Sequence, residues 1–361
     1  MLEREKEKGG GVKKGKATLR EVARLAGVSH TAVSRAVNGL PGLSEETRER
    51  IQSIVAQTGY KPDPHLGAFF HRVRGSGRTI ALLRSAADQS RGNAVPDSLD
   101  SRQDAAILAE ARKAGYHVIL SSVENDLTSD GNLLCVEEGL VDAVIANIMP
   151  SDALRGIVPH VPVVSLEYEP LIKGVDCVLT DVARGVFAQM SHLHALGHRR
   201  IACFVPASRS WPCRHFLMGF EAACEDFDIL PPDAYRVPIH FGRNEHVLAI
   251  HDFLDRVMGS ESPPTAIVTY DVYAPELMRQ CADRGLRLPE DMSIVGFDDS
   301  PDLHRDCLVP LTTFRQNFDQ EAFHALRLLA ARTPDRSIPC HTVLVEGELV
   351  VRKSTSAPKR I

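Results

Sequence analysis

Three short helical patterns follow one another in residues 18–62, each with its own start and stop signals, so this segment has few ways to fold. Thr18 opens a capping box with the glutamate three residues on. Gly27 ends the first pattern, because glycine adopts a left-handed backbone without steric cost. Ser29 and Ser44 cap the second and third patterns, whose apolar residues recur at helical spacing. The segment predicts three helices around one small core.

The tight turn between the first two patterns is typical of a helix–turn–helix, whose second helix lies in the DNA major groove. The exposed N-terminal positions of that helix are His30 and Thr31, with Arg35 one turn later. Arg35 can pair bidentately with guanine, and its two neighbours can hydrogen-bond adjacent bases. We expect further polar residues to contact phosphates: Thr18, Ser29, Ser34, Asn38, Ser44 and Tyr60. An ordinary three-helix bundle with solvated polar faces is the alternative.

Charge is divided unevenly along the 361-residue chain. Residues 1–78 hold 15 Lys and Arg against 8 Asp and Glu, a net charge of +7, whereas the remainder holds 27 against 39, a net charge of −12. The whole chain therefore carries −5. A basic head on an acidic body suits a DNA reader with a separate sensor, because neutralisation of phosphates drives DNA affinity. Residues 1–16 are charged and Gly-rich, so we expect a disordered basic tail there.

The eight cysteines are scattered without a CxxC pair, which is typical of free thiols in a reducing cytoplasm. The sequence shows no signal peptide and no apolar run of membrane length, so we expect a cytoplasmic protein without a membrane segment. His192, His194 and His198 are close together, but Gly197 should end their helix before the last of them. We therefore expect no metal site and no cofactor. Catalytic motifs such as a nucleophile elbow are missing, and we expect no enzyme.

From residue 78 onward, short apolar runs rich in Val and Ile alternate with helical patterns at 101–114, 183–196, 214–226, 244–257 and 272–284. This alternation predicts parallel, doubly wound α/β sheets in two lobes. The break between the lobes should fall near residues 170–180, with the strand region 343–352 crossing back. In such sheets ligands bind beyond the carboxyl ends of the strands, so a cleft between two lobes can hold a small molecule.

The motifs of both parts together resemble the lactose-repressor (LacI/GalR) family of transcriptional regulators. The head carries AxLAGVSxxxVSRxxNG, SEETRERI and GYKP, and the body carries LGHRRIA (196–202), GLRLPEDMSIVGFDDS (285–300) and PLTTFRQNF (310–318). The resemblance runs from Thr18 to about Arg352. It implies an all-α helix–turn–helix head over residues 17–62, followed by a hinge or linker over residues 63–77. Residues 78–353 would form a two-lobed α/β domain of the type I periplasmic-binding-protein fold, which binds an effector and dimerises. Residues 354–361 would form a flexible tail.

In this family the segment after Pro62 forms a hinge helix whose leucine opens the central minor-groove step of DNA. Phe69 stands at that position here, with Leu66 one helical turn earlier as the alternative wedge. Apolar wedges kink DNA by partial unstacking. Packing of Phe69 onto the body is the competing interpretation. A second departure is Ala32, where many members carry a threonine that contacts phosphate, and that contact is expected to be lost.

The resemblance also implies a set of effector-binding residues near the strand ends: Glu167, Tyr270, Asp271, Asp298 and Gln316. Trp211, the only tryptophan, follows a predicted strand and can either stack on a sugar face or pack in the core. Members of the family often carry the motif RxxGF, whose arginine binds the ligand. In this sequence Phe216 occupies the position of that arginine. Arg214 can substitute if the loop is rebuilt. This departure argues against a standard hexose and favours a more apolar or aromatic effector, or none.

Together these features predict a homodimeric, effector-responsive transcriptional repressor that binds a pseudo-palindromic operator in double-stranded DNA. The alternative is a constitutive DNA-binding architectural regulator with a vestigial ligand cleft. A third hypothesis is a small-molecule carrier or enzyme with an incidental head. Activation instead of repression stays open, because it depends on where the operator lies.

Overall fold

The structure is a computed structural model that describes residues 19–37, 43–58, 60, 78–85, 99–127, 133–148, 152–206, 210–229, 235 and 245–359, apart from a few side chains. The chain divides into two compact units, Met1–Gly77 with Leu134–Leu140, and Arg78–Leu133 with Val141–Ile361. We call residues up to 77 the head and the second unit the body. Within the described ranges, no helix is long and apolar enough to cross a membrane.

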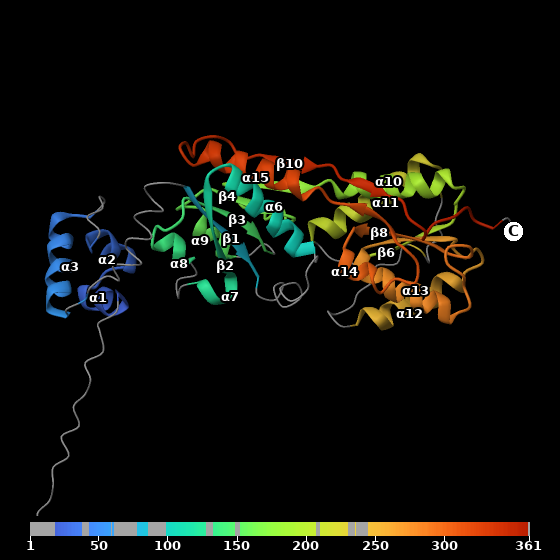
Figure 1. The fold of residues 1–361 in the computed structure, drawn as a ribbon, viewed down its shortest axis with the longest axis horizontal. Helices are drawn as coiled ribbons and strands as arrows, with labels where there is room; N and C mark the ends of the chain where they lie inside the picture. The colour runs from blue at the N-terminus through green and yellow to red at the C-terminus, as the bar shows by residue number, and fades with distance from the viewer. Residues whose placement is uncertain are drawn as a thin grey trace, which may run out of the picture. The chain divides into compact units, whose positions relative to one another are not determined.

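The described part of the head holds α1 (Leu19–Ala26), α2 (His30–Val37) and α3 (Glu45–Thr58) (Figure 1). Its core buries six residues drawn from these helices: Val22, Ala23, Ala26, Val33, Ala36 and Ile51. Gly27 has a φ of 63°, and the N–H of Val28 donates to the carbonyl of Ala23 at 3.1 Å, which closes α1. The three predicted helices and the glycine stop between the first two are confirmed.

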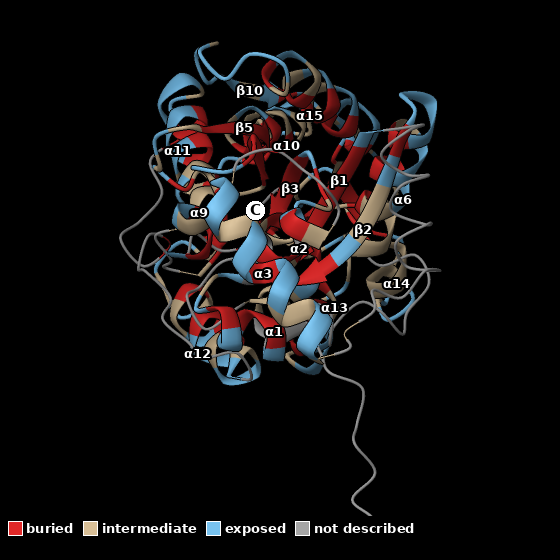
Figure 2. Cartoon of the chain, turned by 90° about the vertical axis from the view of Figure 1, so that its left-hand side faces the viewer, coloured by how far each residue is buried: buried red, intermediate tan, exposed pale blue. Residues whose placement is uncertain are grey.

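The N-terminal lobe of the body is built on a six-stranded parallel sheet in the order β10–β5–β4–β3–β1–β2. Its first elements are β1 (Arg78–Arg84), α6 (Leu99–Lys113), β2 (Tyr116–Ser122), α7 (Val123–Asp126), β3 (Ala143–Asn147), α9 (Asp152–Ile157), β4 (Val163–Leu166) and β5 (Val175–Thr180). Between α7 and β3 the chain forms α8 (Leu134–Glu137), which belongs to the first unit. Figure 2 shows β1 and β3 buried almost throughout, whereas β2 at the sheet edge is partly exposed.

The C-terminal lobe has a five-stranded sheet in the order β11–β9–β8–β7–β6, parallel except that β11 runs antiparallel to β9. Its elements are α10 (Val182–Ala195), β6 (Ile201–Phe204), α11 (Trp211–Asp226), α12 (His246–Met258), β7 (Ala266–Thr269), η2 (Asp271–Tyr273), α13 (Ala274–Asp283), β8 (Ser293–Asp298), α14 (Pro301–His304) and β9 (Thr312–Arg315). The chain then forms α15 (Phe318–Arg332), β10 (Thr342–Val345) and β11 (Glu348–Val350).

The chain passes between the two sheets three times. It runs from β5 to α10, from β9 to α15, and from β10 to β11. β10 pairs with β5 and β11 pairs with β9, so the predicted return of the strand region 343–352 is confirmed. The predicted break near residues 170–180 coincides with the end of β5. The predicted alternation of strands and helices is confirmed from β1 to β8, except that β5 follows β4 without a helix between them.

Helices cover the sheets through separate apolar clusters. In the C-terminal lobe, one cluster includes Met190 of α10 and Phe220 of α11, and another includes Phe253 of α12. In the N-terminal lobe, Ile107 of α6 and Leu326 of α15 belong to a third cluster. α15 therefore packs on the N-terminal sheet although it follows a strand of the other lobe, which places its first turn at a passage between the lobes.

Gly219 gives a test of this packing, because a Cβ at this position of α11 would collide with the backbone of Ala183 in α10. We expect Gly219→Ala to lower the free energy of unfolding by about 1–3 kcal/mol, since two helix backbones must separate. Denaturant titration measures the loss. Met218→Ala is the matched control, because Met218 is 51% exposed and its truncation should change stability by less than about 0.5 kcal/mol. Equal effects of the two changes would contradict the close helix crossing.

Candidate functional site

α2 presents one face that takes no part in the core of the head. Val33 and Ala36 are buried, whereas Arg35 between them is exposed. The hydroxyl of Ser29 accepts a hydrogen bond from the N–H of Ala32 at 3.2 Å and so caps the helix. Three predicted contact residues lie on the same helix, with side chains outside the described part of the structure: His30, Thr31 and Ser34.

Two other residues that are predicted to bind DNA, Ser44 and Tyr60, also make contacts within the head. Ser44 Oγ accepts from the N–H of Thr47 at 3.3 Å and lies 2.8 Å from Thr47 Oγ1, as expected of the N-cap of α3. Tyr60 packs partly buried against the head core, and burial raises the pKa of its hydroxyl. Phosphate contacts of both groups stay predictions. The remaining predicted DNA contacts lie outside the described residues: Thr18, Asn38, Leu66 and Phe69.

In the body, polar side chains gather where strands of the N-terminal sheet end. Arg84 ends β1, Asn147 ends β3 and Glu167 follows β4. Gln103 of α6 joins them, because its Oε1 accepts from Asn147 Nδ2 at 2.6 Å and from Arg84 Nη2 at 3.1 Å. Gln103 Nε2 donates to Glu167 Oε1 at 3.1 Å. Arg84 Nε also donates to Asp104 Oδ1 at 3.0 Å, so a buried cation is paired within this group.

Glu167 is the predicted effector residue of this group. Burial raises the pKa of its carboxyl to about 7, although the nearby Arg84 opposes the rise. The carboxyl therefore changes its charge near neutral pH. Its backbone has a φ of 60°, an uncommon left-handed conformation for a residue with a Cβ. Such backbone strain is concentrated at functional sites, which supports a binding role for Glu167.

A row of hydrogen bonds crosses from the N-terminal lobe to the C-terminal lobe. Glu321 Oε1 at the start of α15 lies 2.5 Å from Thr180 Oγ1 at the end of β5. Thr180 Oγ1 lies 2.6 Å from Gln316 Oε1, and Gln316 Nε2 donates to Asp298 Oδ1 at 2.7 Å. We call these four residues the interlobe row. Gln103 Nε2 donates to Glu321 Oε2 at 3.2 Å and connects the row to the polar group at the N-terminal strand ends.

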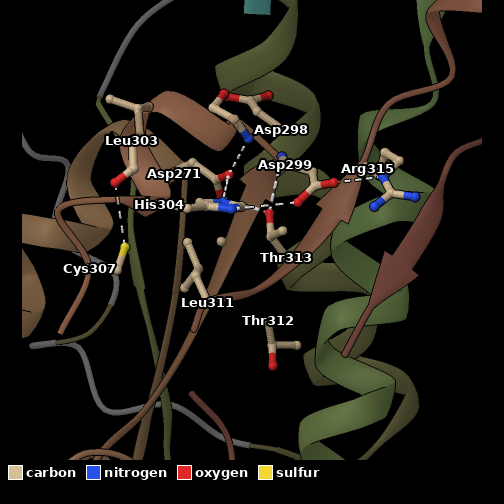
Figure 3. Close-up of polar contacts among 12 residues, drawn as sticks. Asp271, Asp298, Asp299, Leu303, His304, Cys307, Leu311, Thr312, Thr313 and Arg315 are labelled. Carbon is tan, nitrogen blue, oxygen red and sulfur yellow. Dashed lines mark hydrogen bonds and ion pairs between the residues drawn. The ribbon is translucent and has the colours of Figure 1, made fainter. Parts of the chain in front are cut away.

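Asp298 lies on a strained turn at the end of β8. Asp298 and Asp299 have φ values of 119° and 52°, both in the left-handed region. The carboxylate of Asp271 holds the turn, because it accepts hydrogen bonds from the N–H of Ser300 at 2.9 Å and from Thr313 Oγ1 at 2.7 Å (Figure 3). Asp271 is fully buried, so in this structure its oxygens support the turn from inside the lobe.

His304 and two arginines complete the support of this turn. His304 Nε2 lies 2.8 Å from Asp271 Oδ2, and Figure 3 shows its ring between Asp271 and Asp299. Burial raises the pKa of Asp271, although the contact with His304 opposes the rise. Asp299 pairs with Arg315 Nε and Arg352 Nη2, each at 2.6 Å. Burial of Asp299 opposes these contacts, but hydrogen bonds from the two arginines lower the pKa of its carboxyl.

Aromatic rings pack around Tyr270 in the C-terminal lobe. The ring centroids of Phe216 and Tyr270 are 4.9 Å apart, and those of Tyr270 and Phe297 are 5.6 Å apart. Phe216 is fully buried, and Tyr270 directly follows the last residue of β7. Among the described residues, the hydroxyl of Tyr270 is buried without a hydrogen-bond partner. Buried hydroxyls normally have partners, so Tyr270 is a candidate donor to a bound molecule.

Trp211 begins α11 and shares a feature with Tyr270. Its ring stacks on His215 with 3.5 Å between the ring centroids. Its indole nitrogen is buried and has no hydrogen-bond partner within the described structure. Arg214, one position before His215, is exposed. Trp211 is thus both a packing residue and a candidate hydrogen-bond donor.

The interlobe row contains some residues that were predicted to bind the effector and others that were not predicted. Asp298 and Gln316 are joined directly, and Glu167 is linked to the row through Gln103. The predicted set did not include four further polar residues: Gln103, Asn147, Thr180 and Glu321. Asn147 and Thr180 end predicted strands, so the rule that ligands bind at strand ends indicates them. Gln103 and Glu321 lie on helices, where the sequence offers no comparable signal.

The three clustered histidines have separate contacts. His198 is buried, with Nδ1 at 2.8 Å from Thr265 Oγ1 and Nε2 at 2.8 Å from the carbonyl of Ser356. His192 Nε2 lies 3.0 Å from Thr355 Oγ1, and the ring of His194 stacks on Phe227. In the described ranges, no group of three or more His, Cys, Asp or Glu residues is arranged to hold a metal ion.

Comparison with known proteins agrees with both parts of this structure. Residues 18–63 match the bacterial regulatory proteins of the lacI family, and residues 190–355 match the periplasmic binding protein-like domain. The transcriptional regulator DegA of Bacillus subtilis (strain 168) is 25% identical over 349 residues, covering 94% of this chain and 98% of DegA. The transcriptional repressor CytR of Escherichia coli (strain K12) is 28% identical over 350 residues, covering 94% and 97%.

Solved structures are also similar along most of the chain. The transcriptional regulator CelR in complex with cellobiose has a TM-score of 0.62 and 24% identity, covering 94% of this chain and 99% of CelR. The lac repressor dimer bound to operator and the anti-inducer ONPF has a TM-score of 0.59 and 25% identity, covering 95% and 100%. The fold and its relatives define a transcriptional regulator, not an enzyme, with a helix–turn–helix head and a periplasmic-binding-protein-like body. Residues 18–63 carry the helix–turn–helix domain of the lacI family of bacterial regulatory proteins, and relatives along nearly the whole chain are transcriptional regulators.

Asp271→Asn tests the support of the Asp298 turn. Three hydrogen-bond donors converge on the Asp271 carboxylate, so an asparagine must direct its own NH₂ group at one of them. We expect the free energy of unfolding to fall by about 1–3 kcal/mol, as measured by denaturant titration. Asp252→Asn, on the exposed face of α12, is the matched control and should stay within about 0.5 kcal/mol of wild type. An equally small effect at both positions would show that Asp271 does not hold the turn.

Proposed function

We propose that the chain is a repressor that acts as a homodimer in the cytoplasm, binds a pseudo-palindromic operator and responds to a small-molecule effector between the lobes of its body. The head would read one half-site per protomer in successive major grooves, about 34 Å apart. The lac repressor structure, a dimer on its operator, supports this assembly. The observation that carries the effector role is the interlobe row, because it joins the strand ends of both lobes through side chains that the effector would contact.

The polar side chains of the interlobe row favour a neutral molecule with hydroxyl groups, and the aromatic group around Tyr270 suits an apolar or aromatic part of that molecule, as expected from Phe216 in place of the arginine of the family. Glu167, Asp298 and Gln316 would accept or exchange hydrogen bonds with it. Tyr270 and Trp211 would each donate a hydrogen bond and offer an aromatic surface. Two structures of similar fold contain sugars, CelR with cellobiose and a regulator from Enterococcus faecium with ribose, at 24% and 23% identity. Phe216 and Asp271 would support the effector-binding residues without contacting the effector themselves. Arg214 would contact the effector only if its loop were rebuilt.

One observation favours the alternative of a constitutive regulator with a vestigial cleft. Gln103 uses both its oxygen and its nitrogen in contacts inside the protein, and Gln316 does the same. A cleft whose polar groups satisfy one another does not require a ligand. We favour the effector-responsive function, because the buried hydroxyl of Tyr270 and the indole nitrogen of Trp211 have no such partners among the described residues.

The DNA-binding assignment extends to residues of the head and the hinge. Residues 17–62 would form the reading domain and residues 63–77 the hinge, followed by the effector-binding and dimerisation domain over residues 78–353. Base contacts would come from His30, Thr31 and Arg35. Phosphate contacts would come from Thr18, Ser29, Ser34, Asn38, Ser44 and Tyr60, and the minor-groove wedge would be Phe69 or Leu66.

Arg35→Ala tests base reading by α2. On an operator selected from random duplexes, we expect a loss of about 1–3 kcal/mol of binding free energy and a relaxed preference at one base pair per half-site. Competition binding with each single-base operator variant measures both effects. Arg24→Ala is the control, since Arg24 is an exposed arginine of α1 outside the reading helix. Uniform weakening on every sequence would place Arg35 among the phosphate contacts instead.

Ligand titration tests the cleft. We expect ribose, cellobiose or adenosine to change the fluorescence of Trp211 saturably, because the only tryptophan lies at the proposed site. Asp298→Asn should weaken that binding by about tenfold or more, since it replaces a charged acceptor. Glu290→Gln, an exposed change of the same kind, should leave the affinity unchanged. A flat signal with all three compounds, together with unchanged operator affinity, would favour the constitutive alternative.

A further inference from the structure

The interlobe row contains three short contacts but too few hydrogens to make them all. Thr180 Oγ1 lies 2.5 Å from Glu321 Oε1 and 2.6 Å from Gln316 Oε1. A threonine hydroxyl carries one hydrogen and can donate to only one of these two oxygens. The amide nitrogen of Gln316 supplies the third contact, to Asp298 at 2.7 Å. One contact therefore needs a hydrogen that only a protonated carboxyl can provide.

Reversing the amide of Gln316 does not remove this requirement. Its nitrogen would then donate to Thr180, and its oxygen would face Asp298, which would have to be protonated. With the amide nitrogen of Gln316 facing Asp298, Thr180 donates to Gln316, and Glu321 donates to Thr180. Either assignment leaves one carboxyl proton in a row that begins in the N-terminal lobe and ends in the C-terminal lobe.

The surroundings of Glu321 favour the proton at its end of the row. Glu321 is 1% exposed, and its second oxygen accepts from Gln103 of α6. Burial raises the pKa of Glu321 to about 7, and the like charge of Glu167 after β4 adds to the rise. Two arginines lie near this part of the row and both have other partners: Arg84 donates to Asp104 and Gln103, and Arg102 donates to the carbonyl of Asp299. At the far end of the row, burial beside Asp271 also raises the pKa of Asp298.

We infer that Glu321 is a further residue of the effector cleft, that it carries a proton in this arrangement of the lobes, and that the row couples the joining of the lobes to proton uptake. Loss of that proton to solvent leaves Thr180 with two acceptors and one hydrogen. One contact then becomes a repulsion between oxygens, and the link from α15 and β5 to Asp298 weakens. The inference rests on the proposed function only in treating this cleft as the effector site.

The pH dependence of stability tests the proton on Glu321. A carboxyl that binds its proton near pH 7 in the folded chain and near pH 4.3 in the unfolded chain stabilises the fold at low pH, and this stability is lost as the pH rises to about 7. We expect the unfolding equilibrium constant to rise on the order of 50-fold from pH 5 to pH 8 through this group alone. Glu321→Gln, whose amide can donate to Thr180 at every pH, should remove that part of the wild-type rise.

Two further variants keep this test decisive. Glu290→Gln makes the same chemical change on the exposed surface and should keep the wild-type pH dependence. Glu321→Leu is also uncharged, so it should lose the same part of the dependence as Glu321→Gln even if the glutamine variant folds poorly. A full wild-type rise in both Glu321 variants would overturn the assignment of the proton.

Hydrogen exchange tests the link between the lobes. After correction for the intrinsic effect of pH, amides at the passages around residues 180–182 and 315–318 should exchange faster at pH 8 than at pH 6 in the wild-type chain. The same amides should exchange equally at both pH values in Glu321→Gln. Equal protection at both pH values in the wild type would overturn the coupling of the lobes to the proton.

These measurements need neither an effector nor DNA, so they separate this inference from the proposed function. A chain that shows the pH dependence but binds none of ribose, cellobiose or adenosine keeps the proton on Glu321 and loses the proposed effector role. A chain that binds one of these compounds without the pH dependence loses only the inference.

Discussion

The three passages of the chain between its two sheets determine where the chemistry of the body lies. β5 and β9 each end at such a passage, and α15 begins at one. Thr180 at the end of β5, Gln316 directly after β9 and Glu321 in α15 are therefore brought within hydrogen-bond distance. The carboxyl ends of parallel strands are where α/β proteins bind ligands. Here those ends supply the polar residues of both lobes, and the passages join them.

Burial of several carboxyl groups gives this region its electrostatic character. An isolated buried charge is costly, so buried acids are either paired, hydrogen-bonded or neutralised by a proton. Asp299 follows the first route, with two arginines at 2.6 Å. Asp271 follows the second, with three donors around its oxygens. Glu321 follows the third, because the hydrogen bonds of the row cannot be completed without a carboxyl proton.

Much of the fold could be predicted from the sequence, because local signals determine it. The caps and Gly27 predict the head helices, and the alternating apolar runs predict the strands that β1 to β8 confirm. The set of side chains in and beside the interlobe row was harder to predict. Gln103 and Glu321 are ordinary polar residues on helices, and only the packing of α6 and α15 on the same sheet brings them together. The full burial of Phe216 beside Tyr270 was also hard to predict, because it depends on tertiary packing.

The proposed function requires two copies of this chain to read DNA together through their heads. Selection of bound duplexes from a random library by the full-length protein, followed by native mass spectrometry of the complex, tests it most directly. We predict enrichment of a pseudo-palindromic sequence with half-sites one helical turn apart, bound by two chains per duplex. Enrichment of no sequence, or of a single half-site bound by one chain, would contradict this account.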